Sequence, residues 1–384
     1  MKNDYYGTKM YINSTCLESN IHYIKKHYPT MSIIAMIKAN AYGHGDLEIA
    51  KIIQNVNVNF FGVADFEEGI RLRNNGITAN IMVMNPSKAN LEVILENNLE
   101  PVIYNYSMLS QLVSVLQNNA KLNKKFLNST ISSGVENSQI RIHIKINTGM
   151  NRWGFEDKDV DTLIWKLKEI QSEYNVRVDS IYSHLASANE LKDDDFTRQQ
   201  INRLTHCIDL FNKEFKYKIN SHILNSTAVL RNFTSKKINY LRVGLLLYGG
   251  FRHDKITPVA ELKCPISQIR TVNAMESIGY NRRYIAKTNL KIGIVPFGYA
   301  DGLQRHWGNG VLKFYFKKKL IPTLGDISMD SCIVDLSSLD NVNVGDELCY
   351  FGKERPIWDL AKELNTIPHE ITSVLSRRIK RIYE

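Results

Sequence analysis

Short apolar runs alternate with helical patterns through residues 14–246 of this 384-residue chain. The runs are rich in Ile, Val and Phe. Amphipathic segments such as residues 66–73, which Asn74-Asn75-Gly76 terminates, separate them. Eight strand–helix repeats of this kind predict a (β/α)8 TIM-like barrel. A doubly wound open sheet is the alternative, but the Gly-x-Gly-x-x-Gly phosphate loop expected for it is absent. The eight runs are residues 33–37, 60–64, 80–84, 101–104, 141–146, 179–184, 222–225 and 239–243.

The rhythm changes at about Leu245, where strand-like runs begin to follow one another without helices between them. Turns such as Gly308-Asn309-Gly310 separate these runs, and a final helical region is expected from Ile357 onward. We therefore expect an α/β chain in which a mainly β domain (247–384) follows the barrel (14–246), with residues 1–13 packing on the β domain. The later runs are residues 259–263, 266–272, 292–297, 311–316, 320–324, 332–336 and 347–351.

Composition excludes several classes of protein. Hydrophobic residues make up 43% and charged residues 23% of the chain, as in ordinary globular domains. No apolar stretch approaches the roughly 18 residues that span a bilayer. The first residues also lack the apolar core of a secretion signal. We expect a cytoplasmic protein without a membrane partner.

The remaining bulk features favour neither a metal site nor a nucleic-acid partner. Five scattered cysteines without a Cys-x-x-Cys pair predict reduced thiols and no zinc site. The net charge of +10 is spread along the chain. Its densest clusters, at residues 317–319 and 377–381, accompany no nucleic-acid-binding module. A polar stretch at residues 118–139 is predicted to be a surface insertion without assigned function.

Reactive side chains gather where the predicted barrel strands end, which is the face where barrel enzymes build their active sites. Strand one ends at Lys38, strand six at His184, strand seven at Ser226 and strand eight at Arg242, while strand five carries Lys145. Each has an ordinary structural explanation as a surface lysine, a core histidine, a helix cap or a snorkelling strand residue. Their coincidence on one rim favours a functional site. A desolvated lysine there would be a nucleophile or a base.

The segment after the first strand is the most specific signal. Lys38-Ala39-Asn40-Ala41-Tyr42-Gly43-His44-Gly45 resembles the cofactor signature of the alanine racemases, which use pyridoxal 5′-phosphate (PLP). The resemblance covers nearly the whole chain and implies that Lys38 carries PLP through its amine while Tyr42 helps to bind the phosphate. It also implies that Arg242 faces the pyridine nitrogen and that His184 supports this arginine. The implied remainder of the phosphate cradle is Ser226, Gly244 and Leu245.

The resemblance assigns a substrate side as well. Asn147-Thr148-Gly149-Met150-Asn151-Arg152 is similar to the family's Asp-Thr-Gly-Met-x-Arg loop, which implies that Arg152 binds the substrate carboxylate. Lys145 matches a lysine that is often carbamylated in the family and braces this arginine. Two departures stand out. Asn147 replaces the usual Asp, and His369-Glu370 stands where the family has Tyr-Glu near the phosphate and the substrate side chain.

A second base is implied in the β domain. Residues 277–284, Ser-Ile-Gly-Tyr-Asn-Arg-Arg-Tyr, resemble the catalytic tyrosine segment of the family and make Tyr280 the candidate, with a buried core tyrosine as the alternative. Tyr299, Met329 and Asp330 match residues that wall the substrate pocket. In the family these segments reach the partner's cofactor, which implies a head-to-tail homodimer with shared sites.

These expectations combine into a racemase that interconverts L- and D-alanine with two bases, Lys38 and Tyr280 of the partner subunit, and supplies D-alanine for peptidoglycan. A racemase of serine or of a broader set of amino acids is the nearest alternative, because His369 is smaller than tyrosine and can donate a hydrogen bond. A basic amino-acid decarboxylase would lack the Gly298-Tyr299-Ala300-Asp301-Gly302 segment. A PLP-binding homeostasis protein without strong catalysis would end after the barrel.

Overall fold

The structure, a computed structural model, describes residues 7–119, 122 and 139–384. It divides into two compact units. The barrel unit comprises residues 24–39 and 46–244, and the β unit comprises the remainder, namely residues 1–23, 40–45 and 245–384. The chain therefore passes from one unit to the other more than once, and the segment that follows Lys38 belongs to the β unit from Asn40 to Gly45.

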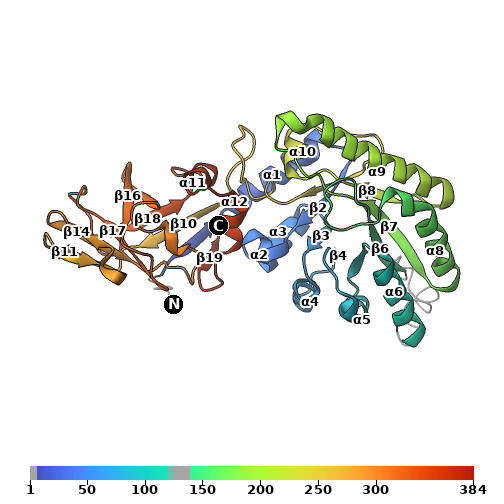
Figure 1. The fold of residues 1–384 in the computed structure, drawn as a ribbon, viewed down its shortest axis with the longest axis horizontal. Helices are drawn as coiled ribbons and strands as arrows, with labels where there is room; N and C mark the ends of the chain where they lie inside the picture. Colours follow the sequence, from blue (N-terminus) through green and yellow to red (C-terminus); the bar gives the residue numbers. More distant parts are fainter. Residues whose placement is uncertain (1–6, 120–121, 123–138) are drawn as a thin grey trace. The chain divides into compact units, whose positions relative to one another are not determined.

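The barrel unit is built on eight parallel strands (Figure 1). They are hydrogen-bonded in the order β8-β7-β6-β5-β4-β3-β2-β9, which confirms the predicted nearly closed barrel. All neighbours pair in parallel, as in the register Phe60↔Asn80 between β3 and β4. The strands are β2 (Ser32–Met36), β3 (Phe60–Val63), β4 (Asn80–Val83), β5 (Glu100–Ile103), β6 (Ile140–Lys145), β7 (Val176–Tyr182), β8 (Asn220–His222) and β9 (Tyr240–Val243).

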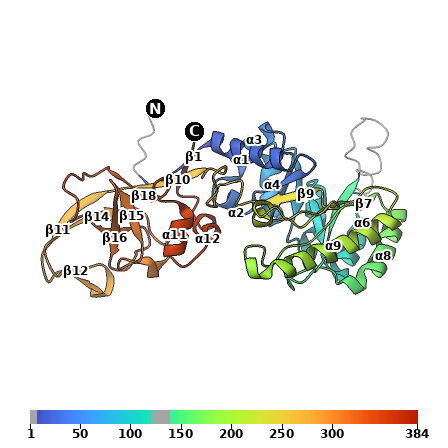
Figure 2. The same ribbon diagram turned by 90° about the horizontal axis from the view of Figure 1, so that it is seen from above.

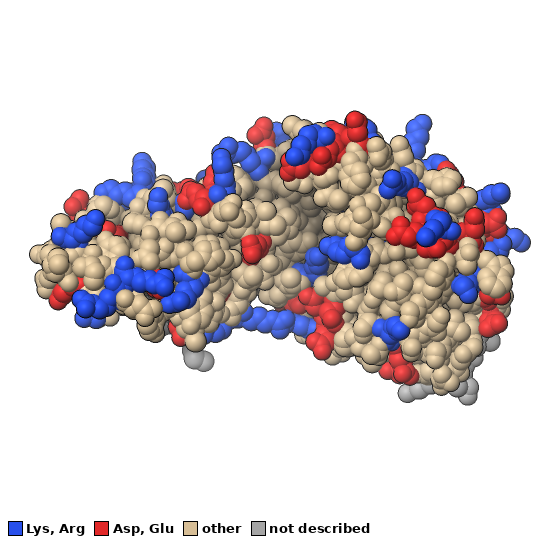
Figure 3. Space-filling model, in the orientation of Figure 1, with Lys and Arg blue, Asp and Glu red and all other residues tan. Residues whose placement is uncertain are grey.

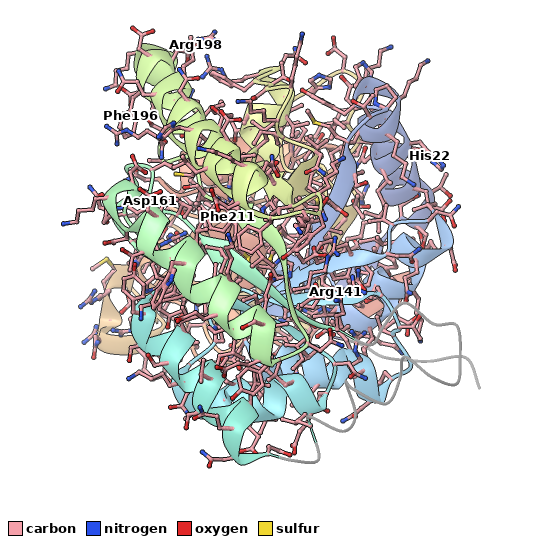
Figure 4. All side chains as sticks on the ribbon, turned by 90° about the vertical axis from the view of Figure 1, so that its right-hand side faces the viewer. His22, Arg141, Asp161, Phe196, Arg198 and Phe211 are labelled. Carbon is pink, nitrogen blue, oxygen red and sulfur yellow. The ribbon has the colours of Figure 1, made fainter. Side chains whose placement is uncertain are left out.

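Helices follow the barrel strands and cover them on the outside. On α9, Phe211 is buried and Arg198 is exposed, and the helix lies beside α8, which carries the exposed Asp161 (Figure 4). A capping box of Asp65 and Glu68 begins α4 and satisfies backbone N–H groups at its start. The helices that follow the barrel strands are α2 (Lys38–Tyr42), α3 (Asp46–Asn55), α4 (Phe66–Asn74), α5 (Leu91–Glu96), α6 (Tyr106–Asn118), α8 (Val160–Glu173), α9 (Asp194–Glu214) and α10 (Ser226–Leu230). Helix α1 (Ser14–His27) precedes the first of these strands.

The β unit holds a nine-stranded sheet in the order β11-β14-β17-β16-β15-β18-β10-β1-β19 (Figure 2). Within it, β1 pairs antiparallel with β10 and parallel with β19. A separate hairpin of β12 (Ser277–Ile278) and β13 (Tyr284–Ile285) flanks Tyr280. The sheet strands are β1 (Lys9–Ile12), β10 (Ala260–Pro265), β11 (Gln268–Val272), β14 (Leu290–Val295), β15 (Lys313–Phe316), β16 (Lys319–Leu324), β17 (Cys332–Asp335), β18 (Glu347–Phe351) and β19 (Lys380–Tyr383).

The C-terminal region differs from the expectation that it is helical throughout. Two short helices, α11 (Ile357–Glu363) and α12 (Pro368–Ser373), are present, but the chain then forms strand β19. All four residues of β19 are half-buried, and its sequence, Lys-Arg-Ile-Tyr, does not alternate between apolar and polar side chains. Tertiary pairing with β1 therefore decides its conformation.

Two surface features bear on partners. Within residues 7–119, 122 and 139–384, no helix is long and apolar enough to cross a membrane. On the face that Figure 3 shows, acidic and basic side chains are interspersed rather than forming one continuous basic patch. Most of the polar stretch predicted as a surface insertion (residues 120–121 and 123–138) lies outside the described residues, and α6 ends at the first residue of the stretch, Asn118.

Candidate active site

The carboxyl ends of the barrel strands collect positive charge. Lys38 follows β2 and is half-buried, and burial is the main cause that lowers the pKa of its amine. The positive charges of Arg242 and Arg152 lower this pKa further, whereas Glu68 acts in the opposite direction. A lysine in such surroundings gives up its proton more readily than a solvated lysine does, which a nucleophile or a base requires.

Arg242, on β9, is held by three acceptors inside the barrel unit. Its Nη1 donates to Nδ1 of His222 at 2.7 Å, and its Nη2 donates to the carbonyl of Ser183 at 3.1 Å and to Nδ1 of His184. The guanidinium is only 3% exposed. The structure thus brings together Arg242 and His184, as the sequence predicted, and adds His222, which the sequence analysis did not single out.

Both imidazoles beside Arg242 are neutral. Burial, reinforced by the charge of Arg242, holds the pKa values of His184 and His222 well below that of a free histidine. A neutral imidazole keeps a lone pair on one ring nitrogen, and here that nitrogen is the one that accepts from Arg242. The two histidines therefore fix the guanidinium plane without adding positive charge.

Lys145, on β6, is the most strongly perturbed amine of the site. It is 4% exposed, and its Nζ lies 5.1 Å from the ring centre of Trp153 and 5.6 Å from that of Tyr182. Burial lowers the pKa of Lys145 to about 7, and the charges of Arg242, Arg152 and Lys38 add to this effect. A large fraction of this amine is consequently uncharged near neutral pH, the form that reacts with electrophiles.

The loop that carries Arg152 is organised by Asn147. The carbonyl oxygen of this side chain accepts from the backbone N–H groups of Gly149 (3.2 Å) and Asn151 (3.0 Å), and its amide group donates to Glu156 at 2.9 Å. A carboxylate could accept the first two hydrogen bonds but could not donate the third. The side-chain amide of Asn147 therefore suits its neighbour Glu156, to which the carboxylate of the family's usual Asp could not donate.

Ser226 and Gly244 also meet within the barrel unit. Ser226 is the first residue of α10, whose N-cap residue Asn225 accepts from the N–H of Ala228 at 3.0 Å. The Ser226 hydroxyl accepts from the backbone N–H of Gly244 at 3.1 Å. Two members of the predicted phosphate cradle are thus adjacent, whereas Leu245, the third, belongs to the β unit.

The segment after Lys38 has an unusual backbone. Ala39, Asn40, Ala41 and Tyr42 all have left-handed φ angles, of 52°, 55°, 52° and 54°. Each such residue costs about 1–2 kcal/mol relative to a right-handed conformation. The sequence does not indicate this conformation, because Ala rarely adopts it. Glu68 contributes to holding it in the barrel unit, since its carboxylate accepts from the N–H of Ala39 at 2.6 Å.

His44 and the C-terminal strand hold the rest of this left-handed turn within the β unit. Nδ1 of His44 lies 3.0 Å from the carbonyls of both Ala41 and Tyr42, and the ring is fully buried, which lowers its pKa to about 4. The hydroxyl of Tyr383 donates to the carbonyl of His44 at 2.8 Å, and Nε of Arg381 donates to that of Gly43 at 3.0 Å. Long-range contacts thus offset the local strain.

Tyr42 and His369 meet in the β unit. Their ring centres lie 5.7 Å apart, and Tyr42 also packs on Tyr248 at 5.3 Å. Tyr248 in turn stacks on His44, with centres 4.4 Å apart and planes 13° from parallel. The left-handed turn is thereby joined to α12, and His369 lies beside Tyr42.

The predicted second base and substrate wall are exposed groups of the β unit. Tyr280 is 62% exposed, which excludes the alternative of a buried core tyrosine. Tyr299 and Met329 come together because the N–H of Tyr299 donates to the carbonyl of Ser328 at 3.0 Å. Asp330 accepts from Nη1 of Arg378 at 2.9 Å. These residues present reactive and polar atoms to their surroundings.

Sequence comparisons agree with this geometry. Residues 12–251 match the description "Alanine racemase, N-terminal domain", and residues 259–383 match "Alanine racemase, C-terminal domain". This chain belongs to the alanine racemase family. The alanine racemase of Clostridium tetani is 32% identical over 378 residues, covering 95% of this chain and 92% of that protein. Alanine racemase 1 of Caldanaerobacter subterraneus is 30% identical over 392 residues, covering 98% and 94%.

A solved structure gives the same result for the fold. The alanine racemase of Clostridium difficile 630 superimposes with a TM-score of 0.87 at 27% sequence identity, covering all of this chain and 97% of that chain. Alanine racemases are PLP-dependent isomerases, and both family domains are represented here at nearly full length.

The donor set of the barrel unit fits a phosphorylated cofactor. Lys38, Lys145, Arg152 and Arg242 lie close enough for their positive charges to lower the pKa values of the two lysines. Such a cluster is stabilised by an anion, and PLP brings a phosphate while an amino acid brings a carboxylate. The Ser226 hydroxyl and the Lys38 amine, whose pKa is lowered, are the other groups that PLP needs.

Proposed function

We propose that this protein interconverts L- and D-alanine with PLP, in the cytoplasm, and so supplies D-alanine for peptidoglycan. The observation that carries the proposal is the gathering of Lys38, Arg242 and Arg152 on one face of a barrel whose sequence matches alanine racemases throughout. The matched C-terminal domain, with its exposed Tyr280, distinguishes the chain from a cofactor carrier that ends after the barrel.

PLP would be held by the amine of Lys38 and by a phosphate cradle of Ser226, Gly244, Leu245 and Tyr42, with His369 close to Tyr42. When bound, PLP withdraws electrons from the α-carbon of an amino acid and makes its hydrogen acidic. Arg242 would face the pyridine nitrogen. An arginine stays protonated and has no lone pair to accept a hydrogen, so this nitrogen would remain unprotonated, which favours proton exchange over transamination.

Racemisation requires removal of a proton from one face of the α-carbon and its return on the other. Lys38 has a lowered pKa and is suited to serve one face as a base. Tyr280 of the partner subunit would serve the other face through its phenol oxygen. Arg152 would bind the substrate carboxylate and steer that phenol, and Tyr299, Met329 and Asp330 would wall the pocket.

Lys145 would brace Arg152. Its pKa of about 7 leaves much of the amine uncharged, and an uncharged amine can attack carbon dioxide and release a proton to solvent, which gives a carbamate. The carbamate would replace a positive charge beside Arg152 with a negative one. This change would turn repulsion into an ion pair at the ring of Trp153, which both side chains approach.

Exchange of the α-hydrogen in deuterated water tests the proposal. The PLP-loaded protein should exchange the α-hydrogen of both alanine enantiomers and interconvert them, whereas a binder without catalysis would show the cofactor's visible absorbance and no exchange. The Tyr280→Phe variant should still bind PLP and should fail to racemise. A Tyr280→Phe protein that is PLP-loaded and racemises at the wild-type rate would exclude Tyr280 as a base.

Mixing two inactive variants tests the shared head-to-tail dimer. Lys38→Ala and Tyr280→Phe each remove one base. If each site takes Lys38 from one subunit and Tyr280 from the other, a mixed dimer contains one intact site. Random remixing of equal amounts should therefore restore about a quarter of wild-type activity. If both bases came from one chain, remixing would restore nothing.

His369 favours one second candidate, a racemase of serine or of a broader set of amino acids. Its imidazole packs beside Tyr42 and is smaller than the tyrosine of the family. Comparing kcat/KM for L-alanine, L-serine and L-lysine decides between the two. A His369→Tyr variant that loses serine turnover while retaining alanine turnover would assign the breadth to this residue.

A further inference from the structure

A chain of buried side chains continues from Arg242 through the interior of the barrel unit. Beyond the contact of Arg242 with His222, Nε2 of His222 lies 3.2 Å from the hydroxyl of Ser180, which lies 2.7 Å from Nδ1 of His143. Nε2 of His143 then lies 2.9 Å from a carboxylate oxygen of Glu100. All five groups are buried, and they come from β9, β8, β7, β6 and β5.

The two ends of this chain determine the direction of every hydrogen bond in it. A guanidinium only donates and an ionised carboxylate only accepts. Nδ1 of His222 must therefore be bare, its Nε2 must carry the hydrogen that Ser180 accepts, and the hydroxyl of Ser180 must donate to Nδ1 of His143. Nε2 of His143 then donates to Glu100. Any other assignment leaves a buried hydrogen without an acceptor or places two hydrogens in one contact, and each such defect costs about 1–3 kcal/mol.

Two neighbours keep the ends in place. The ring of Tyr182 stacks on His222 with centres 4.5 Å apart and lies 5.2 Å from the guanidinium carbon of Arg242. Nη1 of Arg141, the residue labelled in Figure 4, lies 3.6 Å from the second carboxylate oxygen of Glu100. Glu100 therefore accepts a hydrogen bond from His143 on one oxygen and forms an ion pair with Arg141 through the other.

The same region has the spacing of a cation site, since ligand atoms of Glu100, His143 and Asp179 lie within 4.8 Å of one another. A cation there would require a lone pair on Nε2 of His143. That nitrogen is the one that must carry the hydrogen if Arg242 is to find an acceptor on His222. The hydrogen-bond chain therefore accounts for this cluster without a metal ion.

We propose that Glu100, at the opposite end of the barrel strands from Lys38, is a positioning residue for Arg242. It acts through His143, Ser180 and His222. Their hydrogen positions leave Nδ1 of His222 with a lone pair that accepts a hydrogen bond from the guanidinium. The role in catalysis rests on the proposed function, because Arg242 would face the pyridine nitrogen of PLP. Glu100 would thus tune the group that favours racemisation while lying far along the barrel from the reacting atoms.

Substitution of Glu100 by Gln should propagate along this chain. A side-chain amide has one accepting and one donating end, whereas Arg141 and His143 both present donors. One of these contacts must then fail. If the contact with His143 fails, no acceptor holds the hydrogen of this imidazole on Nε2. If every hydrogen bond along these residues then reversed its direction, Nδ1 of His222 would carry a hydrogen that points at Arg242. The guanidinium would be displaced.

Nitrogen-15 NMR of the histidines tests the chain directly, with and without PLP. Loss of signals in His143→Gln and His222→Gln assigns the two residues among the ten histidines. In the wild-type protein both rings should carry their hydrogen on Nε2 and have a hydrogen-bonded, bare Nδ1. A wild-type His222 protonated on Nδ1 would overturn the proposal without any variant.

Matched variants separate the chain from a simple charge effect. Glu100→Gln should shift the ring-nitrogen signals of His222, whereas Asp179→Asn, which removes a nearby negative charge outside the chain, should leave them in place. In a Ser180→Ala background the shift caused by Glu100→Gln should vanish. Equal shifts with and without Ser180, or from Asp179→Asn, would show coupling through space and refute the chain.

The functional arm uses PLP-loaded protein. Glu100→Gln should shift the cofactor's visible absorbance and lower kcat for alanine by about 2- to 30-fold, the range of couplings carried by buried networks, with little change in KM. Asp179→Asn should do neither. If the wild-type protein neither binds PLP nor racemises alanine, the proposed function fails while the NMR result still decides the chain. Normal racemisation by a wild-type protein whose His222 carries its hydrogen on Nδ1 fails the chain alone.

Discussion

The two units hold their functional side chains in opposite ways. In the barrel unit Arg242 and Lys145 are 3% and 4% exposed, and burial and neighbouring charges determine their chemistry. In the β unit Tyr280 and Met329 are 62% and 53% exposed. The barrel groups are therefore organised within one chain, whereas the groups of the β unit are presented outward. This contrast implies that substitutions in the two units should divide differently between stability and activity.

The largest expected effect is a loss of racemase activity, which in the barrel unit comes with a loss of stability and in the β unit does not. Tyr280→Phe should lower kcat by roughly 10²- to 10⁴-fold. It should leave the unfolding free energy within about 0.5 kcal/mol, because its hydroxyl is exposed. Arg242→Leu should also abolish racemisation, and it should destabilise the PLP-free protein by about 3 kcal/mol, because His222, His184 and the Ser183 carbonyl lose their donors. Denaturant unfolding and racemase assays measure both. Equal loss of stability in the two variants would break the contrast.

The left-handed turn offers the next test, because the β unit encloses it tightly. A Cβ on Gly43 would lie 1.9 Å from the carbonyl oxygen of Thr372 in α12, at a φ of +84°. Gly43→Ala should therefore cost at least about 3 kcal/mol of unfolding free energy. Gly76→Ala is the matched control, since its φ is +81° but nothing lies within 4 Å of the added carbon. It should cost about 1 kcal/mol.

Lys145 gives the stability of the barrel unit a dependence on pH. Its pKa falls from 10.5 to about 7 on folding, so between these values the unfolded chain binds more protons than the folded one. The stability of the PLP-free protein should therefore rise with pH across this window, by up to about 1.4 kcal/mol per pKa unit.

Lys145→Met isolates this contribution. In buffer free of carbon dioxide, the variant should be more stable than the wild type at about pH 7, and this advantage should shrink as the pH approaches 10.5. Urea titrations at two pH values measure the difference. A constant difference between variant and wild type would mean that Lys145 is not desolvated.

The smallest effect concerns backbone strain at Ala39. This residue is exposed and has a φ of 52°, so Ala39→Gly should stabilise the protein by about 1 kcal/mol. Ala89→Gly, at an exposed position of a short helix, should destabilise it by a similar amount. Thermal melts of the two variants compare them. A loss of stability in Ala39→Gly would mean that the left-handed turn carries no strain.

The barrel and the rim of its site could be predicted from the sequence because both are determined by residues that lie close together along the chain. Each buried strand is a short run of branched apolar residues, and Lys38, His184 and Arg242 stand at or near the strand ends. The sheet strands between residues 260 and 351 were predictable for the same reason, whereas the two-residue strands β12 and β13 were not. An error of one or two residues in a predicted strand boundary does not assign a side chain to a different strand.

The remaining features depend on contacts between distant residues. Strands β1 and β19 are four residues long and acquire their conformation from pairing with each other. Nothing in Ala39-Asn40-Ala41 indicates left-handed angles, which Glu68 and His44 hold from outside the turn. The path from Glu100 to Arg242 crosses five strands, so it exists only once the barrel register is set. The match of Asn147 to Glu156 likewise requires the folded loop.

The pairing of β1 with both β10 and β19 has a consequence for synthesis on the ribosome. Strand β1 is made before any other strand described here, yet its two neighbours end at Pro265 and Tyr383. The nascent chain must therefore carry an unpaired strand edge while the whole barrel is translated, and this edge is closed only once β19 has emerged. Domains tend to fold as they emerge, and exposed strand edges invite aggregation. A chaperone that shields residues 9–12 during translation would cover this unpaired edge.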